Sequence, residues 1–325
     1  MMKFIALTAL ILTHVLMLNV KNASAQLIAF PTKPIRFIVT FPPGGSTTIV
    51  ARLIGQKLTE SWGQPVVVEN RPGANSVIGT EVLVKSPPDG HTILLVVNTH
   101  VINPLVMKLP YDTFKDFAPI TTVYSTEYVM VTHPSVPANS LQEFISLAKS
   151  KPDQFSYASG DNGGITHLVS EMFNAMAGLK LHNVPYKGSA PALADTLGGH
   201  VQVFFGPPIV ALPHIQSGKL KALAQSGDRR SPTMPQVPTF SEAGLPGYDV
   251  TTRYGVLAPA GTPRPIIDKL ATEIHKIMEM PEIKEKLVNQ GLEPRTSSPE
   301  QFESLMRSDM AKFERVIKRI GISIQ

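Results

Sequence analysis

The residues best suited to bind a charged ligand form one loop rich in glycine and hydroxyl groups. The loop, Phe-Pro-Pro-Gly-Gly-Ser-Thr-Thr at 41–48, lies between an apolar run at 35–41 and a stretch at 49–58 with apolar residues at helical spacing. A helix start offers unpaired N–H groups and the positive end of the helix dipole, and glycine lets a ligand approach the backbone. The pattern therefore predicts either an anion-binding loop or an ordinary strand-to-helix turn capped by Ser46 or Thr47.

Two later stretches repeat this plan of strand, glycine-rich loop and helix. The first has its loop at 160–164, before a helix expected at 165–177, and the second has its loop at 187–191. A polar triplet, Asn-Thr-His at 98–100, follows another apolar strand. Ligands of open α/β sheets lie beyond the carboxyl ends of the strands, and these loops occupy that position.

Motifs for catalysis are missing from the sequence. It contains no G-x-S-x-G elbow, no H-E-x-x-H helix, no cysteine and no obvious pair of acids. We therefore expect neither an enzyme nor a cofactor, with a secreted hydrolase as the competing class.

The amino-acid composition is typical of a globular protein, and the charge pattern does not indicate a nucleic-acid-binding surface. Of the 325 residues 43% are hydrophobic and 17% charged, so the chain can bury a sizeable core. The formal charge is +5, but the basic residues are scattered rather than arranged in a stripe. This mild excess suits a small anionic ligand without demonstrating one.

The first 25 residues have the layout of a signal peptide. Lys3 precedes an apolar region at 4–20, and Ala23-Ser24-Ala25 forms a small-residue cleavage site, so we expect cleavage before Gln26 and export to the periplasm. An N-terminal membrane anchor is the competitor, but polar interruptions and the short span disfavour it. Without cysteine, neither disulfides nor an amino-terminal lipid anchor can form.

Strands and helices alternate along the rest of the chain, which predicts an α/β fold with open, mostly parallel sheets. Consecutive extended segments are expected at 117–124 and 128–132, and a helix start near Asn103-Pro104. The stretch at 227–246, rich in proline and serine, predicts a long surface connection. The last helix is expected at 299–320, with Ser298 and Gln301 as its capping box.

Seven motifs in order resemble one known family. They are FPPGGS at 41–46, GQPVVVENRPGA at 63–74, PDG at 88–90, DFAP at 116–119, VPYKGSAP at 184–191, PTFSEAGLP at 238–246 and LAPAGTP at 257–263. The chain looks like a Bug-family extracytoplasmic solute-binding protein, the receptor class of tripartite tricarboxylate transporters (TctC-like).

The resemblance implies a two-lobed periplasmic-binding-protein fold of the Venus-flytrap, type II-like kind, in which each lobe is a mostly parallel mixed sheet flanked by helices. Lobe 1 would comprise 26–125 and 251–325, and lobe 2 would comprise 126–250. A small carboxylate would be held between them, largely by backbone amides and bridging waters.

The resemblance also carries over candidate ligand-binding residues. In lobe 1 they are Gly44, Gly45, Ser46, Thr47, Thr48 and Thr99. In lobe 2 they are Ser159, Asn162, Thr166, His167, Ser189, Ala190 and Pro191.

Several of these side chains have a structural alternative. Ser159 and Thr166 either cap a helix or contact the ligand, and Lys187 either pairs with a ligand carboxylate or stays solvated. His167 and Glu171 are spaced as two metal ligands on one helix, but no third ligand motif accompanies them, so no metal is expected. His167 is expected to be a structural hydrogen-bonding residue or a donor in the cleft.

The sequence departs from the family pattern at informative positions. Thr48 stands where many members carry Asp, and Gly206-Pro207 where many carry Asp-Asn. Without these carboxylates the site lacks possible partners for a ligand ammonium, which favours a ligand without an amino group. Asp161 stands where Gly is common and weakens this hypothesis, because it can restore a negative charge near the cleft; Gly164 stands where Ser or Thr is common.

The function that follows is a receptor that captures an organic carboxylate and delivers it to integral-membrane permease subunits, without nucleic acid and as a monomer. The alternative is a ligand-sensing subunit that signals to a membrane sensor kinase. Di-, tri- and aromatic carboxylates all remain open as ligands.

Overall fold

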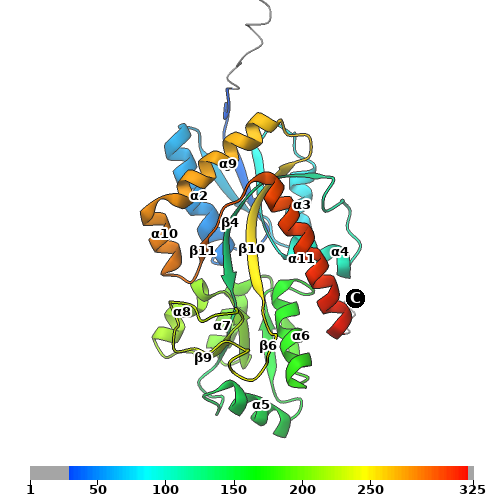
Figure 1. The fold of residues 1–325 in the computed structure, drawn as a ribbon, viewed down its shortest axis with the longest axis vertical. Helices are drawn as coiled ribbons and strands as arrows, with labels where there is room; N and C mark the ends of the chain where they lie inside the picture. The colour runs from blue at the N-terminus through cyan, green and yellow to red at the C-terminus, as the bar shows by residue number, and fades with distance from the viewer. Residues whose placement is uncertain (1–28, 321–325) are drawn as a thin grey trace, which may run out of the picture.

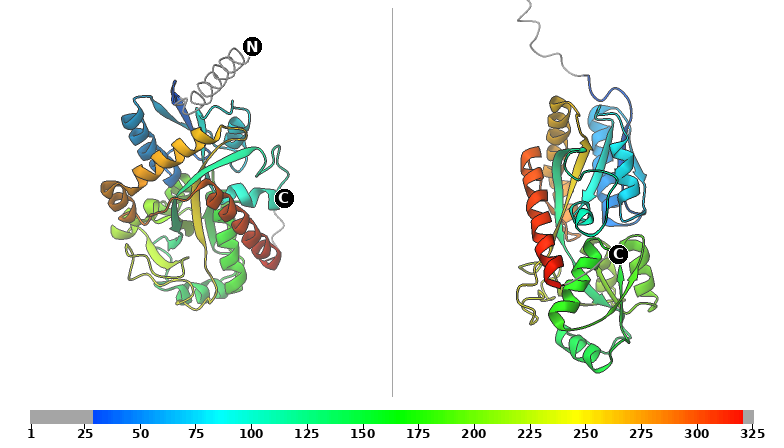
Figure 2. Two further views of the ribbon diagram at one scale, coloured as in Figure 1. Left: turned by 45° about the horizontal axis from the view of Figure 1, so that its top comes forward. Right: turned by 90° about the vertical axis from the view of Figure 1, so that its right-hand side faces the viewer.

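The computed structural model describes residues 29–320, so the predicted signal peptide and its predicted cleavage site lie outside the described residues. Two sheets, each flanked by helices, lie one above the other (Figures 1 and 2). We call the six-stranded sheet with its helices lobe 1. In spatial order its strands are β11 (Glu293–Pro294), β4 (Phe117–Glu127), β10 (Thr251–Pro259), β3 (Thr92–Val97), β1 (Ile35–Val39) and β2 (Val66–Asn70).

The five-stranded sheet with its helices is lobe 2. Its strands are β7 (His182–Pro185), β6 (Ser156–Ser159), β8 (Val203–Gly206), β5 (Val129–Thr132) and β9 (Lys221–Gln225). Parallel pairs join β1 to β2 and β3, and β6 to β7 and β8, while the pairs made by β10 and β5 are antiparallel. The predicted two-lobed α/β fold with mixed sheets is confirmed.

Strand direction places the loops that follow the strands. Because β10 is antiparallel to both β3 and β4, the strands β1 to β4 all run the same way, towards lobe 2. Because β5 is antiparallel to both β8 and β9, the strands β6 to β9 also share one direction, back towards lobe 1. The carboxyl ends of the two parallel sets therefore face each other.

The helices cover both sheets (Figure 1). Those with lobe 1 are α2 (Ser46–Trp62), α3 (Val77–Val84), α4 (Thr99–Val106), α9 (Arg264–Glu279), α10 (Pro281–Val288) and α11 (Pro299–Ile320). Those with lobe 2 are α5 (Leu141–Ser150), α6 (Ile165–Ala177), α7 (Ser189–Leu197) and α8 (Pro208–Gln216). No helix within residues 29–320 is both long and apolar enough to cross a membrane.

Helices α4 and α8 differ from the sequence expectation, and α10 was not predicted. The helix expected to start near Asn103-Pro104 begins four residues earlier, at Thr99, with Pro104 inside it. The unexpected α8 begins directly after Pro207, with Pro208 in its first turn, where a missing N–H costs nothing.

Two chain segments cross between the lobes, and Ser226 joins them. On the outgoing segment, Tyr128 N donates to Ser226 Oγ at 2.8 Å, and Ser226 N donates to Tyr128 O at 2.8 Å. On the returning segment, Ser226 Oγ donates to Val250 O at 2.5 Å, and Val250 N donates to Ser226 O at 2.8 Å. The predicted boundary at 125 falls inside β4, which continues to Glu127.

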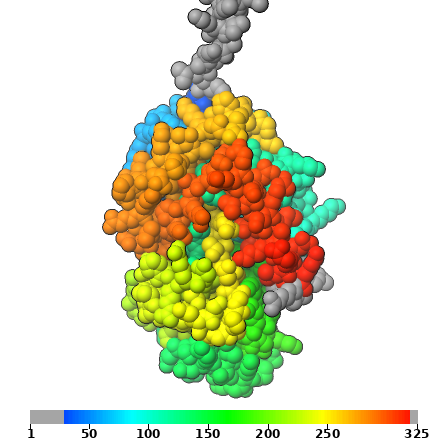
Figure 3. All heavy atoms as spheres, viewed as in Figure 1, coloured from blue at the N-terminus to red at the C-terminus, as the bar shows by residue number. Residues whose placement is uncertain are grey.

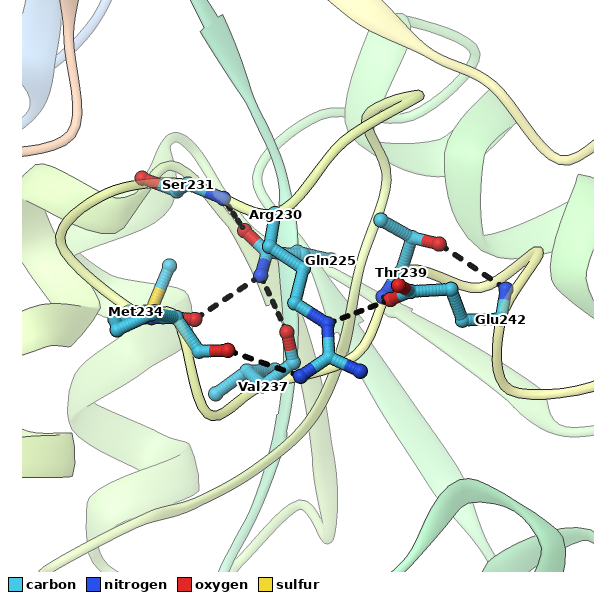
Figure 4. A network of polar contacts seen from close by, with 8 residues as sticks. Gln225, Arg230, Ser231, Met234, Val237, Thr239 and Glu242 are labelled. Carbon is cyan, nitrogen blue, oxygen red and sulfur yellow. Dashed lines mark hydrogen bonds and ion pairs between the residues drawn. The ribbon is translucent and has the colours of Figure 1, made fainter.

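The connection between Ser226 and Val250 is irregular but not loose. At its start Gln225 Nε2 donates to Met234 O at 3.2 Å and to Val237 O at 2.5 Å, while Gln225 Oε1 accepts from Ser231 N at 2.8 Å (Figure 4). The buried amide thus adds side-chain hydrogen bonds to the backbone bonds that hold this segment, such as Gln225 N to Pro238 O and Phe240 N to Gln225 O. With α9 to α11, this loop forms much of the face seen in Figure 3.

Helix α11 is fixed to lobe 1 by a polar network and a glycine. Arg253 Nη1 lies 2.5 Å from Asp309 Oδ1, Asn98 Nδ2 donates to Asp309 Oδ2 at 2.9 Å, and Arg253 N donates to Asn98 Oδ1 at 2.6 Å. A Cβ on Gly255 would overlap the ring of Phe302, so β10 needs glycine there for α11 to pack closely.

Glu127, at the end of β4, is expected to make stability depend on pH. Burial, together with the nearby Asp228, raises the pKa of its carboxyl from 4.5 to about 7, and its Oε2 is buried without a hydrogen-bond partner in the described chain. The folded state then binds this proton more tightly than the unfolded state. The resulting stability is complete below pH 4.5 and is lost as the pH rises through about 7.

Glu127→Gln should remove this decline in stability. The decline lowers the free energy of unfolding by about 1 kcal/mol between pH 5 and pH 8, after allowance for partial solvent exposure. Urea unfolding of both proteins across this range measures it. Glu242→Gln is the control, because Glu242 is exposed and its pKa is lowered by the Thr239 N–H and Arg230. A decline that persists unchanged in Glu127→Gln would contradict the assignment.

Candidate functional site

Loops that follow four strands meet where the lobes face each other. From lobe 1 come the loops after β1 and β3, and from lobe 2 come the loops after β6 and β7. They are close enough that a Cβ on Gly44 would contact Ala190 Cβ at 3.4 Å, and one on Gly188 would lie 2.9 Å from Pro42 Cδ. The polar loops singled out in the sequence are thus brought together, across the two lobes.

Two helices present free N–H groups to this region. Helix α2 has Gly45 as its N-cap, with no side-chain cap, and the backbone N–H groups of Ser46 and Thr47 have no partner among residues 29–320. Helix α7 likewise begins after Gly188 without a side-chain cap, and the N–H groups of Ser189 and Ala190 have no partner in the same range. Such N-termini attract anions.

At the third helix start, that of α6, backbone N–H groups already donate to side chains of the protein. Asp161 Oδ1 accepts from Thr166 Oγ1 at 2.5 Å and from the backbone N–H of His167 at 3.2 Å. Asp161 Oδ2 accepts from Thr99 Oγ1 of lobe 1 at 3.3 Å, and the N–H of Ile165 donates to Thr99 Oγ1 at 3.3 Å. Burial raises the pKa of Asp161, although the hydrogen bonds from Thr166 and His167 oppose this.

These helix starts surround a small inner cavity of about 30 Å³. Seven of the predicted binding residues line it: Gly45, Ser46, Thr47, Thr166, Ser189, Ala190 and Pro191. An outer cavity of about 360 Å³ shares Phe41, Pro42, Gly160 and Asp161 with the inner one. Asn162 and the exposed Lys187 line this outer cavity.

Five predicted residues line neither cavity. Thr48 lies behind the loop, where its Oγ1 accepts from Asn70 Nδ2 at 2.7 Å. Ser159 Oγ bonds to Asp161 O at 2.7 Å and to Asn183 Oδ1 at 2.7 Å, and Thr99 reaches Asp161 as described. Gly44 lies beside Ala190.

His167 is the fifth, and its Nδ1 accepts from the backbone N–H of Gly163 at 3.0 Å. Burial lowers the pKa of His167, which favours the neutral ring that this contact requires. Glu171, the partner considered for a metal, accepts from Tyr157 Oη at 2.6 Å. Within residues 29–320 no group of three metal-ligating side chains is assembled.

Several cavity residues were not predicted. Tyr128 and Tyr254 come from the two crossing segments and line the inner cavity, with Tyr254 Oη 3.5 Å from Ser46 Oγ. Burial raises the pKa of both hydroxyls, so each remains a neutral donor. No local motif marks them, because only the pairing of distant strands brings them here.

The chain matches known proteins along nearly its whole length. The model of the tripartite tricarboxylate transporter family receptor matches residues 50–322. Protein BugT of Bordetella pertussis is 36% identical, over 91% of this chain and 92% of that protein.

Two solved structures show the same fold. An R. palustris protein solved with adipate is 32% identical, with a TM-score of 0.88, over 90% of this chain and 99% of that one. MatC from Rhodopseudomonas palustris with bound malate is 30% identical, with a TM-score of 0.84, over 89% of this chain and 100% of that one. With the motifs, the two lobes and these matches in agreement, the chain belongs to the family of tripartite tricarboxylate transporter receptors, as its resemblance to Bug proteins predicts.

Proposed function

We propose that the protein captures a small organic carboxylate between its lobes and delivers it to the integral-membrane permease subunits of a tripartite transporter. One observation carries the proposal: free N–H groups of α2 and α7, from opposite lobes, converge on one cavity. Oriented N–H groups bind carboxylates without a cationic side chain. Relatives solved with adipate and with malate support this ligand class.

In this proposal Ser46, Thr47, Ser189 and Ala190 hold the ligand carboxylate through backbone N–H groups, and Tyr254 adds a hydroxyl. The predicted residues outside the cavities position these groups. The ligand body extends into the outer cavity, towards Asn162 and Lys187.

The lobes are proposed to turn about the crossing segments, with 26–125 and 251–325 in lobe 1 and 126–250 in lobe 2. The protein acts in the periplasm as a monomer, after cleavage of the leader before Gln26. It carries out no catalysis, since its role is to bind and release.

Binding is tested with the mature protein and a carboxylate panel. A ligand that binds only the folded protein stabilises it by about 2.7 kcal/mol at one hundred times its Kd, so it should raise the Tm in a thermal-shift screen. Calorimetry then gives the affinity. If no di-, tri- or aromatic carboxylate raises the Tm, the proposal fails.

Delivery is tested in a deletion strain by uptake of the radiolabelled ligand. We expect uptake to disappear and to return with the gene on a plasmid. Uptake that persists while induction of the transporter is lost would instead indicate the sensing role.

A further inference from the structure

Three helix N-termini meet at the inner cavity, but only two are free. Those of α2 and α7 have N–H groups without a partner among residues 29–320, whereas the first turn of α6 is bonded to Asp161 and Thr99. Asp161 is 5% exposed and lines both cavities. A carboxylate that belongs to the protein thus occupies a position that a ligand anion could otherwise take.

Glycine at position 164 makes room for this carboxylate. Gly164 is the N-cap of α6 and has φ −90°, which any residue can adopt, so its backbone does not demand glycine. A Cβ there would overlap the Asp161 side chain and lie 2.9 Å from Thr99 Oγ1. Asp161 and Gly164 therefore form a coupled pair, in which the carboxylate replaces the side-chain cap that Gly164 lacks.

The Asp161 carboxylate can accept a further hydrogen bond from a ligand. An ionised carboxylate offers about four lone-pair sites, and three hydrogen bonds from Thr166, His167 and Thr99 are present. Among the described residues, Asp161 is the only acidic or basic side chain that lines the inner cavity. A ligand donor placed there would meet an acceptor, and a second ligand carboxylate would meet like charge.

The two positions that favoured a ligand without an amino group do not line either cavity. Thr48 bonds to Asn70 behind the loop, and a Cβ on Gly206 would overlap the Phe204 ring inside lobe 2. The charge of the inner cavity is therefore set by Asp161.

We propose that Asp161 makes the site selective for carboxylates that carry a hydroxyl or ammonium donor close to the carboxylate. The inference rests on the proposed function: the ligand carboxylate lies on the α2 and α7 N–H groups, and its donor faces Asp161. A hydrogen bond to a charged group is worth about 1.5–3 kcal/mol, so the donor should improve Kd by at least about tenfold.

The test compares matched ligands by calorimetry. The triads are succinate, L-malate and L-aspartate; adipate, 2-hydroxyadipate and 2-aminoadipate; and phenylacetate, mandelate and phenylglycine. Within the triad that binds, we expect a donor-bearing member to bind at least about tenfold more tightly than the plain acid.

Two variants separate selectivity from helix capping. Asp161→Asn keeps the shape of the side chain and should remove the preference, while plain acids bind at least as well as before. The double variant Asp161→Gly/Gly164→Ser removes the carboxylate but restores a hydroxyl at the N-cap, where serine is favoured. It should lose the preference, and its Tm should stay close to that of the wild type once Thr99 Oγ1 shifts slightly away from the new Cβ.

A preference that survives in both variants, or a wild type that binds the plain acid best, would overturn the inference while leaving the receptor function intact. If no member of any triad binds, this inference fails, while the proposed function is decided separately by the wider carboxylate panel of the thermal-shift screen.

Discussion

Gly188→Ala should weaken carboxylate binding by about a hundredfold. Gly188 has φ 127° and ψ 168°, a region that is essentially restricted to glycine and costs other residues about 1–3 kcal/mol. Its new Cβ would also lie 2.9 Å from Pro42 Cδ on the opposite lobe. The substitution therefore displaces the start of α7 and separates the two lobes at the cavity.

Calorimetry with the carboxylate found in the thermal-shift screen measures the effect, and circular dichroism verifies the fold. Gly178→Ala is the matched control: Gly178 also has a positive φ of 64°, but a Cβ there would contact nothing within 4 Å. It should lose stability and keep its affinity. Affinity of Gly188→Ala within about threefold of wild type would contradict the proposed placement of the ligand.

Asp309→Ala should lower the free energy of unfolding by about 3 kcal/mol. Asp309 is 7% exposed and receives both the Arg253 guanidinium and the Asn98 amide. Its removal leaves these two donors without their shared acceptor. The expected loss is at the lower end for a buried pair, because the Arg253 side chain is 34% exposed and keeps some contact with water.

Urea unfolding measures this loss. Glu303→Ala on the same helix is the control, since Glu303 forms an exposed pair with Arg307 and should change stability by at most about 0.5 kcal/mol. Equal stabilities of the two variants would show that the network does not fix α11.

Local signals predicted much of the fold. The range expected for α6 is the one observed, because glycines bound a clear helical period. Ser298 and Gln301 form the predicted capping box of α11. Two prolines account for the differences: Pro104 is tolerated inside α4, and Pro208 lies in the first turn of α8, a helix that was not predicted.

The site was predictable only in part. Repeated strand–loop–helix units located the loops, since the carboxyl ends of parallel strands share one edge. Sequence could not show which side of a loop faces the cavity, so Thr48, bonded to Asn70, could not be separated from Thr47. Tyr128 and Tyr254 depend on the register of strands far apart in the chain.

The bonds of Ser226 limit how the lobes can move. Since one residue is bonded to both Tyr128 and Val250, neither crossing segment can slide along the other without breaking these contacts. Shear is thereby disfavoured, and the two segments can only bend or twist as a pair. Opening is then expected to proceed by bending or twisting of this bonded pair, with Ser226 carried along, rather than by sliding of one segment past the other.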